Sequence, residues 1–242
     1  MQFGSKFKIF KNFLSDLIFP KSCFNCGKSG IWFCHECYNR VILNSNIRCP
    51  FCKLPGGILG QTCFNCRKTH FLDGVIAATE YKNTVIKKLV HKYKYDLIKD
   101  LEKPSGWLIA DYIEALKEKS PDFFKDVDFV VPVPLSVKKT LARGFNQSEL
   151  LSKRLSNHFK WPMAVNSLQK IKSNKRQVNQ KKIGRRQNVR DKYALKDKFK
   201  FKSKKIFLID DVATTGSTLD ECAKIMKKAG AREVWGIVLS QD

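Results

Sequence analysis

The stretch Ile206-Phe-Leu-Ile-Asp-Asp-Val-Ala-Thr-Thr-Gly-Ser-Thr218 decides the fold expected for this chain. Its first four residues form a continuous apolar run, which is typical of a strand covered on both faces of a parallel sheet. Apolar residues then recur at helical spacing from Thr218 to Ala229, and Gly230 ends that helix. A buried strand that leads directly into a helix predicts an α/β fold.

The residues between this strand and this helix point to a ribose phosphate. A hydroxyl-rich loop with one glycine opens the helix, so its backbone N–H groups and the helix dipole favour a phosphate. The candidate phosphate-binding residues are Ala213, Thr214, Thr215, Gly216, Ser217 and Thr218. Asp210 and Asp211 lie at the carboxyl end of the strand, where open α/β sheets bind their ligands. Carboxylates suit sugar hydroxyls, or a magnesium ion that also contacts phosphate.

This pattern resembles the phosphoribosyl-pyrophosphate (PRPP) loop of type I phosphoribosyltransferases. All thirteen positions fit: four apolar residues, two acids, an apolar residue, and then x-Thr-Thr-Gly-x-Thr. The resemblance implies that Asp210 and Asp211 bind the ribose hydroxyls, that Ala213 to Thr218 hold the 5-phosphate, and that Mg²⁺ accompanies PRPP. The alternative is an ordinary strand–loop–helix with a surface acidic pair, which the length of the match disfavours.

The charge of the chain indicates an anionic partner. The 242 residues include 46 basic and 22 acidic side chains, which gives a net charge of +24. Such a surface attracts nucleic acid, anionic lipid or a phosphorylated substrate. A generally lysine-rich proteome would produce the same balance, so composition alone does not name the partner.

Eight of the nine cysteines form four Cys-x-x-Cys pairs, a spacing that indicates metal rather than disulfides in a chain with an intracellular type of fold. The paired residues are Cys23, Cys26, Cys34, Cys37, Cys49, Cys52, Cys63 and Cys66. Two such pairs complete one tetrahedral Zn²⁺ site without an open position, so we expect two structural zinc sites. Consecutive pairing is favoured because each half then holds one short hairpin, but an interleaved arrangement uses the same ligands.

Three parts are expected along the chain: an amphipathic helix at residues 1–20, a zinc-ribbon module at 21–70 and a phosphoribosyltransferase-like domain at 71–242. No stretch has the length of a transmembrane helix. We therefore expect a cytoplasmic protein, and a peripheral position at the inner face of the membrane if the first helix binds lipid. The favoured role for that helix is packing on its own domain.

A second strand–loop–helix is expected next to the PRPP loop. Phe129 to Val131 form a buried strand, and the basic loop that follows ends in Arg143-Gly-Phe-Asn-Gln147. A basic loop with a glycine suits a pyrophosphate, and Arg143 is the expected donor to it, as a catalytic residue beside Asp210 and Asp211.

The sequence assigns no specific ligand to the remaining lysines, arginines and histidines. The helix from Val85 to Tyr93 carries a face with Lys87, Lys88, Lys92 and Lys94, which either binds a polyanion or is simply solvated. His35 is expected to face solvent, and His70, His91 and His158 show no partner pattern. Residues 170–192, with ten cations and one acid, predict a functional lid or a connector.

The order of these parts resembles the ComF family: a cysteine-rich module, Val-Pro-Val-Pro, Arg-Gly-Phe-Asn-Gln, and the PRPP loop. Gln177 and Arg185-Arg-Gln-Asn-Val189 also fit the family, whereas Asn174-Lys-Arg176 replaces its usual Thr-Pro-x. The resemblance implies a type I phosphoribosyltransferase-like parallel sheet with an N-terminal double zinc-ribbon module.

The ComF resemblance also carries the functional expectation. ComFC-type members act in natural transformation, where imported single-stranded DNA enters the cytoplasm. We therefore expect a PRPP-binding protein that handles incoming single-stranded DNA, with a DNA-uptake helicase or a membrane translocation protein as a further partner. The alternative is an active phosphoribosyltransferase, for which no stretch of the sequence identifies the acceptor.

Overall fold

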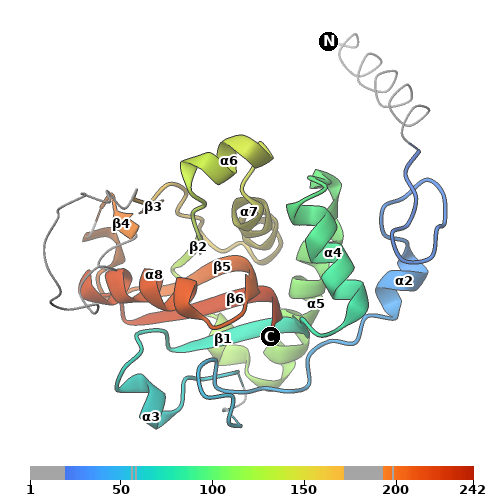
Figure 1. The fold of residues 1–242 in the computed structure, drawn as a ribbon. Coiled ribbons are helices and arrows are strands. Elements are labelled where there is room, and N and C mark those ends of the chain that lie inside the picture. Colours follow the sequence, from blue (N-terminus) through green and yellow to red (C-terminus); the bar gives the residue numbers. More distant parts are fainter. Residues whose placement is uncertain (1–19, 56, 58, 172–192, 198) are drawn as a thin grey trace, which may run out of the picture.

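A four-stranded parallel sheet organises the computed structural model, which describes residues 20–55, 57, 59–171, 193–197 and 199–242 (Figure 1). The strands lie in the order β1-β6-β5-β2, and all neighbours are parallel. Their bounds are β1 Gly74–Glu80, β2 Phe129–Pro132, β5 Lys205–Ala213 and β6 Glu233–Gln241. The predicted α/β class and parallel sheet are confirmed.

Strand β5 is longer than the sequence predicts, and its extra residues carry the acidic pair. On one side the register of β2 ends with Pro132 opposite Ile209, and Val133 N makes a last hydrogen bond to Ile209 O at 2.9 Å. On the other side β6 continues, so that Ala213 still pairs with Gln241. The strand therefore runs through both aspartates, which lie where β5 extends past β2.

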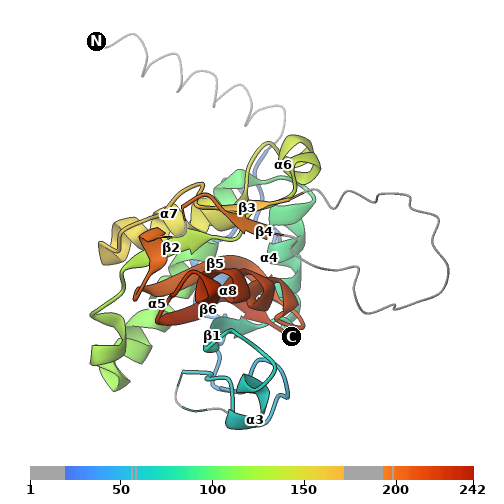
Figure 2. The same ribbon diagram turned by 90° about the vertical axis from the view of Figure 1, so that its left-hand side faces the viewer.

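Helices cover both faces of the sheet. On one face lie α4 (Thr84–Lys94), α5 (Glu102–Lys119) and α7 (Gln147–Phe159), whose buried apolar side chains form one core with Phe207 and Ile209 of β5. On the other face lies α8 (Ser217–Lys228), which packs on Ile206 and Leu208 (Figures 1 and 2). All four β5 side chains are fully buried, as expected for a run that alternates between two covered faces.

The shorter elements refine the expected helices and loops. Helix α5 begins at Glu102, and Pro104 lies in its first turn, where a missing N–H costs nothing. Much of the expected basic loop after β2 is a short helix, α6 (Val137–Arg143). The antiparallel pair β3 (Leu168–Lys170) and β4 (Tyr193–Leu195) flanks the undescribed segment 172–192.

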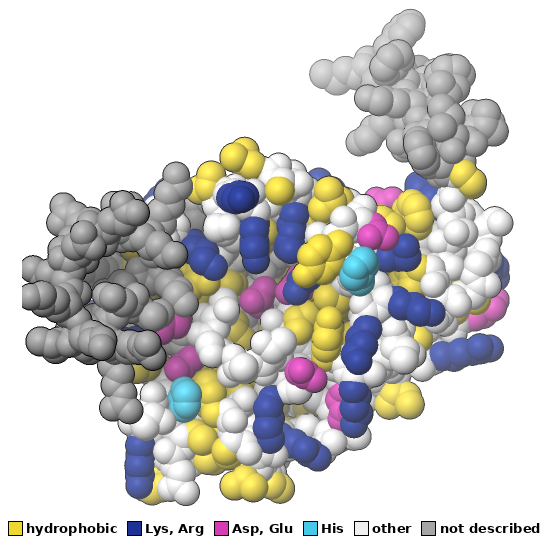
Figure 3. Space-filling view, viewed as in Figure 1, with side chains coloured by type: hydrophobic (Ala, Val, Ile, Leu, Met, Phe, Trp, Pro, Cys, Tyr) yellow, Lys and Arg dark blue, Asp and Glu magenta, His cyan; other side chains and the backbone are white. Residues whose placement is uncertain are grey.

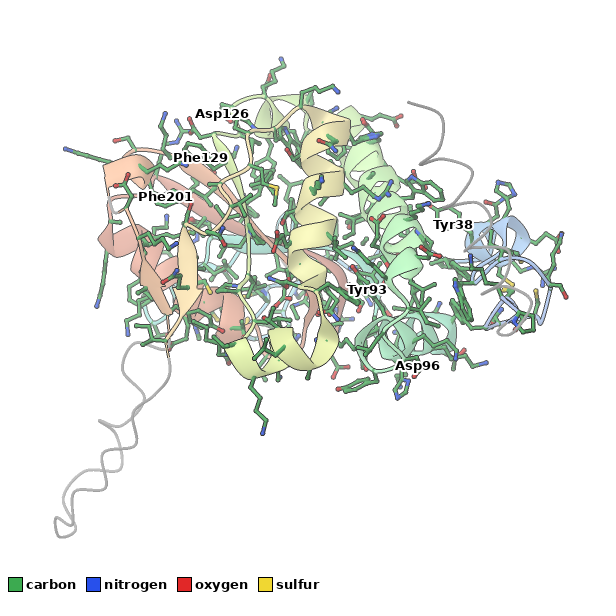
Figure 4. The ribbon with its side chains drawn as sticks, turned by 90° about the horizontal axis from the view of Figure 1, so that it is seen from above. Tyr38, Tyr93, Asp96, Asp126, Phe129 and Phe201 are labelled. Carbon is green, nitrogen blue, oxygen red and sulfur yellow. The ribbon has the colours of Figure 1, made fainter. Side chains whose placement is uncertain are left out.

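Two cysteine-rich units dock on the domain at separate places. The first contains α2 (His35–Asn39) and packs on α5, where the Tyr38 hydroxyl donates to Asp111 Oδ2 at 2.5 Å (Figure 4). The second contains α3 (Phe64–Arg67) and lies beneath β1 (Figure 2). The chain between them follows the edge of β1, where Asn44 N donates to Ala78 O at 2.8 Å.

Two predicted segments fall outside the description. They are the amphipathic helix at 1–20, apart from Pro20, and most of the basic segment 170–192. Within the described part of the chain, no helix combines the length and the apolar character that crossing a membrane requires.

Candidate functional site

The two aspartates at the end of β5 have different partners. Asp211 is 5% exposed, and its Oδ1 lies 2.8 Å from Lys94 Nζ at the end of α4. Asp210 Oδ1 accepts hydrogen bonds from Ser148 Oγ and from the Asp211 backbone N–H, both at 2.9 Å. Lys94 on α4, which precedes β2 in the chain, and Ser148 on α7, which follows it, therefore both contact this acidic pair.

The pKa of Asp210 is shifted by its surroundings in the acidic pair. Burial, and then the neighbouring Asp211 carboxylate, raise the pKa of Asp210 to about 7, while its hydrogen bonds and Lys94 oppose this shift. Asp210 is therefore partly protonated at neutral pH in the ligand-free protein. A ligand that brings hydroxyl donors or positive charge to this position favours the ionised form.

The loop after β5 presents backbone N–H groups at the start of α8. Gly216 is the N-cap, with φ of 71°, and it supplies no side chain to cap the helix. Thr214, Thr215 and Ser217 are exposed, and the Thr215 and Ser217 hydroxyls lie 2.7 Å apart. A twelve-residue helix that begins without a side-chain cap offers N–H groups to an anion.

The second strand–loop–helix lies beside the first, as the parallel pairing of β2 with β5 requires. Asn146 caps α7 by accepting from Ser148 N at 3.1 Å, and its amide donates to Val133 O at 3.1 Å. This capping directs Ser148 toward Asp210. Arg143 ends α6, donates to Gln147 Oε1 at 3.1 Å, and places its guanidinium 5.8 Å from the centre of the Tyr95 ring.

Lys94 and Ser148 are the site residues that the sequence reasoning missed. Lys94 belongs to a helix with four lysines, a pattern that indicates a solvated face, yet its side chain is only 21% exposed. The usable signal for Ser148 was its place directly after Arg143-Gly-Phe-Asn-Gln147. On the face shown in Figure 3, the lysine and arginine side chains of the described residues are dispersed, with acidic side chains between some of them.

The cysteines form two groups that fit a tetrahedral metal. One comprises Cys23, Cys26, Cys34 and Cys37, and the other Cys49, Cys52, Cys63 and Cys66, with the sulfur atoms of each group within 4.8 Å of one another. Cys26 and Cys34 Sγ are 3.5 Å apart, and Cys52 and Cys63 Sγ are 3.6 Å apart. A zinc tetrahedron with bonds of 2.3 Å has edges of about 3.8 Å, so both groups could hold zinc. The consecutive grouping is the predicted one.

His70 has partners that its sequence context does not predict. Its Nδ1 lies 2.9 Å from Asp220 Oδ2 on α8, and its ring stacks on Phe51 with the centroids 3.6 Å apart. By contrast, His35 is exposed, as predicted. His91 and His158 lie on the surface beside Asp96 and Glu114.

Comparison with known proteins places this geometry in a family. Residues 144–241, which contain α7, β5, α8 and β6, match the phosphoribosyl transferase domain. The chain is 30% identical over 195 residues to competence protein F of Haemophilus influenzae, covering 78% of this chain and 84% of that protein.

Two further relatives extend the comparison. DNA utilization protein YhgH of Escherichia coli is 25% identical, covering 90% of this chain and 97% of that protein. Competence protein ComFC of Streptococcus pneumoniae is 31% identical over 157 residues, covering 63% of this chain and 61% of that protein. The chain carries a phosphoribosyltransferase domain with two four-cysteine groups, and it belongs to the competence protein F (ComF) family.

Proposed function

We propose that this protein binds PRPP, or a related ribose phosphate, with Mg²⁺ at the carboxyl ends of β5 and β2 and acts in DNA uptake. The observation that carries the ligand assignment is the uncapped start of α8 next to a pair of carboxylates. Ala213 to Thr218 would hold the 5-phosphate, and Asp210 and Asp211 would bind the ribose hydroxyls. Arg143 would contact the pyrophosphate, the part of the ligand that carries Mg²⁺.

Lys94 and Ser148 would hold the two carboxylates of this site in place. Lys94 neutralises Asp211 in the ligand-free protein, and Ser148 holds one oxygen of Asp210. Both carboxylates are thereby oriented before the sugar arrives, which lowers the ordering cost of binding. If transfer follows binding, the same carboxylates would stabilise the positive charge that develops on the ribose ring.

The role in DNA uptake rests on the relatives and on charge. Relatives are named for competence and for DNA utilization, and the chain has a net charge of +24. Single-stranded DNA would bind through many phosphate contacts, with segment 170–192 as the richest source of cations. A cytoplasmic location and contact with an uptake helicase or a membrane translocation protein complete the proposal.

Replacing both carboxylates should abolish most ribose-phosphate binding. In Asp210→Asn with Asp211→Asn, two charged hydrogen-bond acceptors are lost, and each contributes about 1.5–3 kcal/mol. Calorimetry with PRPP and Mg²⁺ should therefore give an affinity lower by about 100-fold or more. Asp122→Asn, at an exposed carboxylate paired with Lys125, is the control and should bind normally. Unchanged affinity in the double variant would refute the site.

The same calorimetry sample decides between binding and transfer. Incubation with PRPP, Mg²⁺ and a panel of bases and amines should give no acceptor-dependent release of pyrophosphate if the protein only binds. Release with one acceptor would establish the alternative, an active phosphoribosyltransferase.

Asp210→Asn should stabilise the ligand-free protein above neutral pH. A carboxyl group with a folded-state pKa of about 7 and an unfolded-state pKa of about 3.9 binds its proton more tightly when folded. The free energy of unfolding of the wild type therefore decreases as the pH rises from about 4 to about 7, whereas the amide is insensitive. Urea unfolding at pH 8 should favour the variant by up to about 4 kcal/mol, and the difference should fall to about 1 kcal/mol at pH 4.5. A variant that is less stable at pH 8 would contradict this.

Purified protein should contain two zinc ions per chain, because each four-cysteine group supplies a complete tetrahedron. Cys63→Ser with Cys66→Ser should lower the content to one and unfold the second unit, since metal-binding energy there is folding energy. Cys222→Ser should leave the content at two. Elemental analysis that finds one ion or none in wild-type protein prepared without chelator would refute the assignment.

Binding of single-stranded DNA should weaken steeply with salt and show little sequence preference. The expected slope is about −0.7 log units of affinity per log unit of salt for each phosphate contacted. Serine at Lys181, Lys182, Arg185 and Arg186 should flatten this slope, while serine at Lys117 and Lys119 serves as the control. If the segment is instead a lid, the fourfold variant will lose PRPP affinity and keep the slope. A variant unchanged in both would remove the segment from the proposal.

A further inference from the structure

The second cysteine-rich unit directly contacts the loop proposed to bind phosphate. Phe51 lies between Cys49 and Cys52, and its ring faces Gly216, the N-cap of α8. A Cβ added to Gly216 would lie 3.3 Å from Phe51 Cε1, so the ring closes the space behind the loop. Gly216 is itself buried although its neighbours in the loop are exposed.

The same unit also fixes the first turn of α8. Asp220 accepts from the backbone N–H groups of Phe71 and Leu72 at 2.7 and 3.0 Å, and its other oxygen lies 2.9 Å from His70 Nδ1. The His70 ring in turn stacks on Phe51 with only 7° between their planes. Four contacts thus join the residues around the third and fourth cysteine pairs to the helix that begins at Ser217.

The start of the loop is tied to this unit through the end of the chain. Lys53 Nζ donates to Asp242 O, and Asp242 N donates to Ala213 O at 3.1 Å. The loop from Ala213 to Ser217 is therefore held at both ends by contacts that lead back to residues 51–72.

Metal ligation would fix the residues that make these contacts. Phe51 and Lys53 flank Cys52, and His70 N donates to Cys66 O at 3.0 Å. A metal ion held by the four thiolates would restrict the motion of these turns, since one ion joins side chains from two separate stretches of the chain. The unit is anchored below β1, where Thr62 N donates to Asp73 O at 2.8 Å, so it cannot shift as a whole without disturbing the sheet (Figure 2).

The first cysteine-rich unit provides an internal comparison. Its contacts lead to α5, through the Tyr38 hydroxyl on Asp111 and the Tyr38 ring against Trp107 with centroids 6.5 Å apart. Figure 4 shows Tyr38 on that side of the molecule. These contacts end on the helix layer and not on the loop after β5.

We propose that the second four-cysteine site is a positioning element for the ribose-phosphate loop, so that metal binding there and ribose-phosphate binding at Ala213 to Thr218 strengthen each other. This rests on the proposed function of the loop. Phe51 and Asp220 are the positioning residues that link the two sites. Coupling between two binding sites is reciprocal in free energy. Each ligand must therefore raise the affinity of the protein for the other by the same factor, which we expect to be about 5–100.

Calorimetry with PRPP and Mg²⁺ on full-length variants tests the link in one direction. Phe51→Ala and Asp220→Asn should each keep two zinc ions and lose affinity by about tenfold. Phe51→Tyr, which preserves the stacked ring, should retain affinity. Tyr38→Ala, the equivalent change in the first unit, should bind like the wild type. Wild-type affinity in Phe51→Ala and Asp220→Asn would overturn the proposal.

Zinc release from the wild type tests whether PRPP binding affects the metal site. This experiment does not depend on the folding of the Phe51 and Asp220 variants. A zinc-selective chelator should remove the two ions in two phases, assigned to the units with Cys23→Ser and Cys26→Ser protein. PRPP with Mg²⁺ should slow release from the second site by about fivefold or more and leave the first unchanged. Equal slowing at both sites, or at neither, would overturn the proposal.

The outcomes separate this inference from the function on which it rests. If the wild type does not bind PRPP in calorimetry, the proposed function fails and the link fails with it. If the wild type binds PRPP but release of both ions is unaffected, the link fails and the proposed ligand stands.

Discussion

The unequal length of neighbouring strands at the carboxyl edge of the sheet is the constraint on which this site depends. β2 ends at Pro132, while β5 continues beside β6 to Ala213. The part of β5 that extends past β2 therefore carries Asp210 and Asp211, and α8 begins at Ser217, after three intervening residues, with an N-cap that has no side chain. Because both faces of β5 are buried against helices, the position of these groups cannot drift independently of the core.

The negative charge of the two carboxylates at this edge of the sheet lowers the stability of the ligand-free fold. Two adjacent carboxylates beside a sheet are costly, and only Lys94 compensates Asp211 directly among the described residues. The pKa of Asp210 rises because its charged form is poorly solvated and repelled by Asp211. Such a pair is typical of a functional site, where binding repays a cost that the ligand-free fold carries.

Local sequence patterns predicted most of the fold, whereas contacts between distant segments could not be predicted from the sequence. The apolar run at Ile206–Ile209, the helix ended by Gly230 and the four cysteine pairs were all readable from sequence, because each depends on neighbouring residues. The pairing of Lys94 with Asp211 joins residues 117 positions apart and has no local signature. The same holds for His70 with Asp220, which sequence reasoning left without a partner. The roles of Asp210, Asp211, Arg143 and the loop remain predictions until a ligand is observed.

The central claim is that the loop after β5 and its two carboxylates receive a ribose phosphate, and a crystal structure of the protein with PRPP and Mg²⁺ tests it most directly. The account predicts the 5-phosphate against the backbone N–H groups of residues 214–218 and the ribose hydroxyls within hydrogen-bond distance of Asp210 and Asp211. A ribose phosphate bound elsewhere, with this loop and Lys94–Asp211 undisturbed, would contradict it.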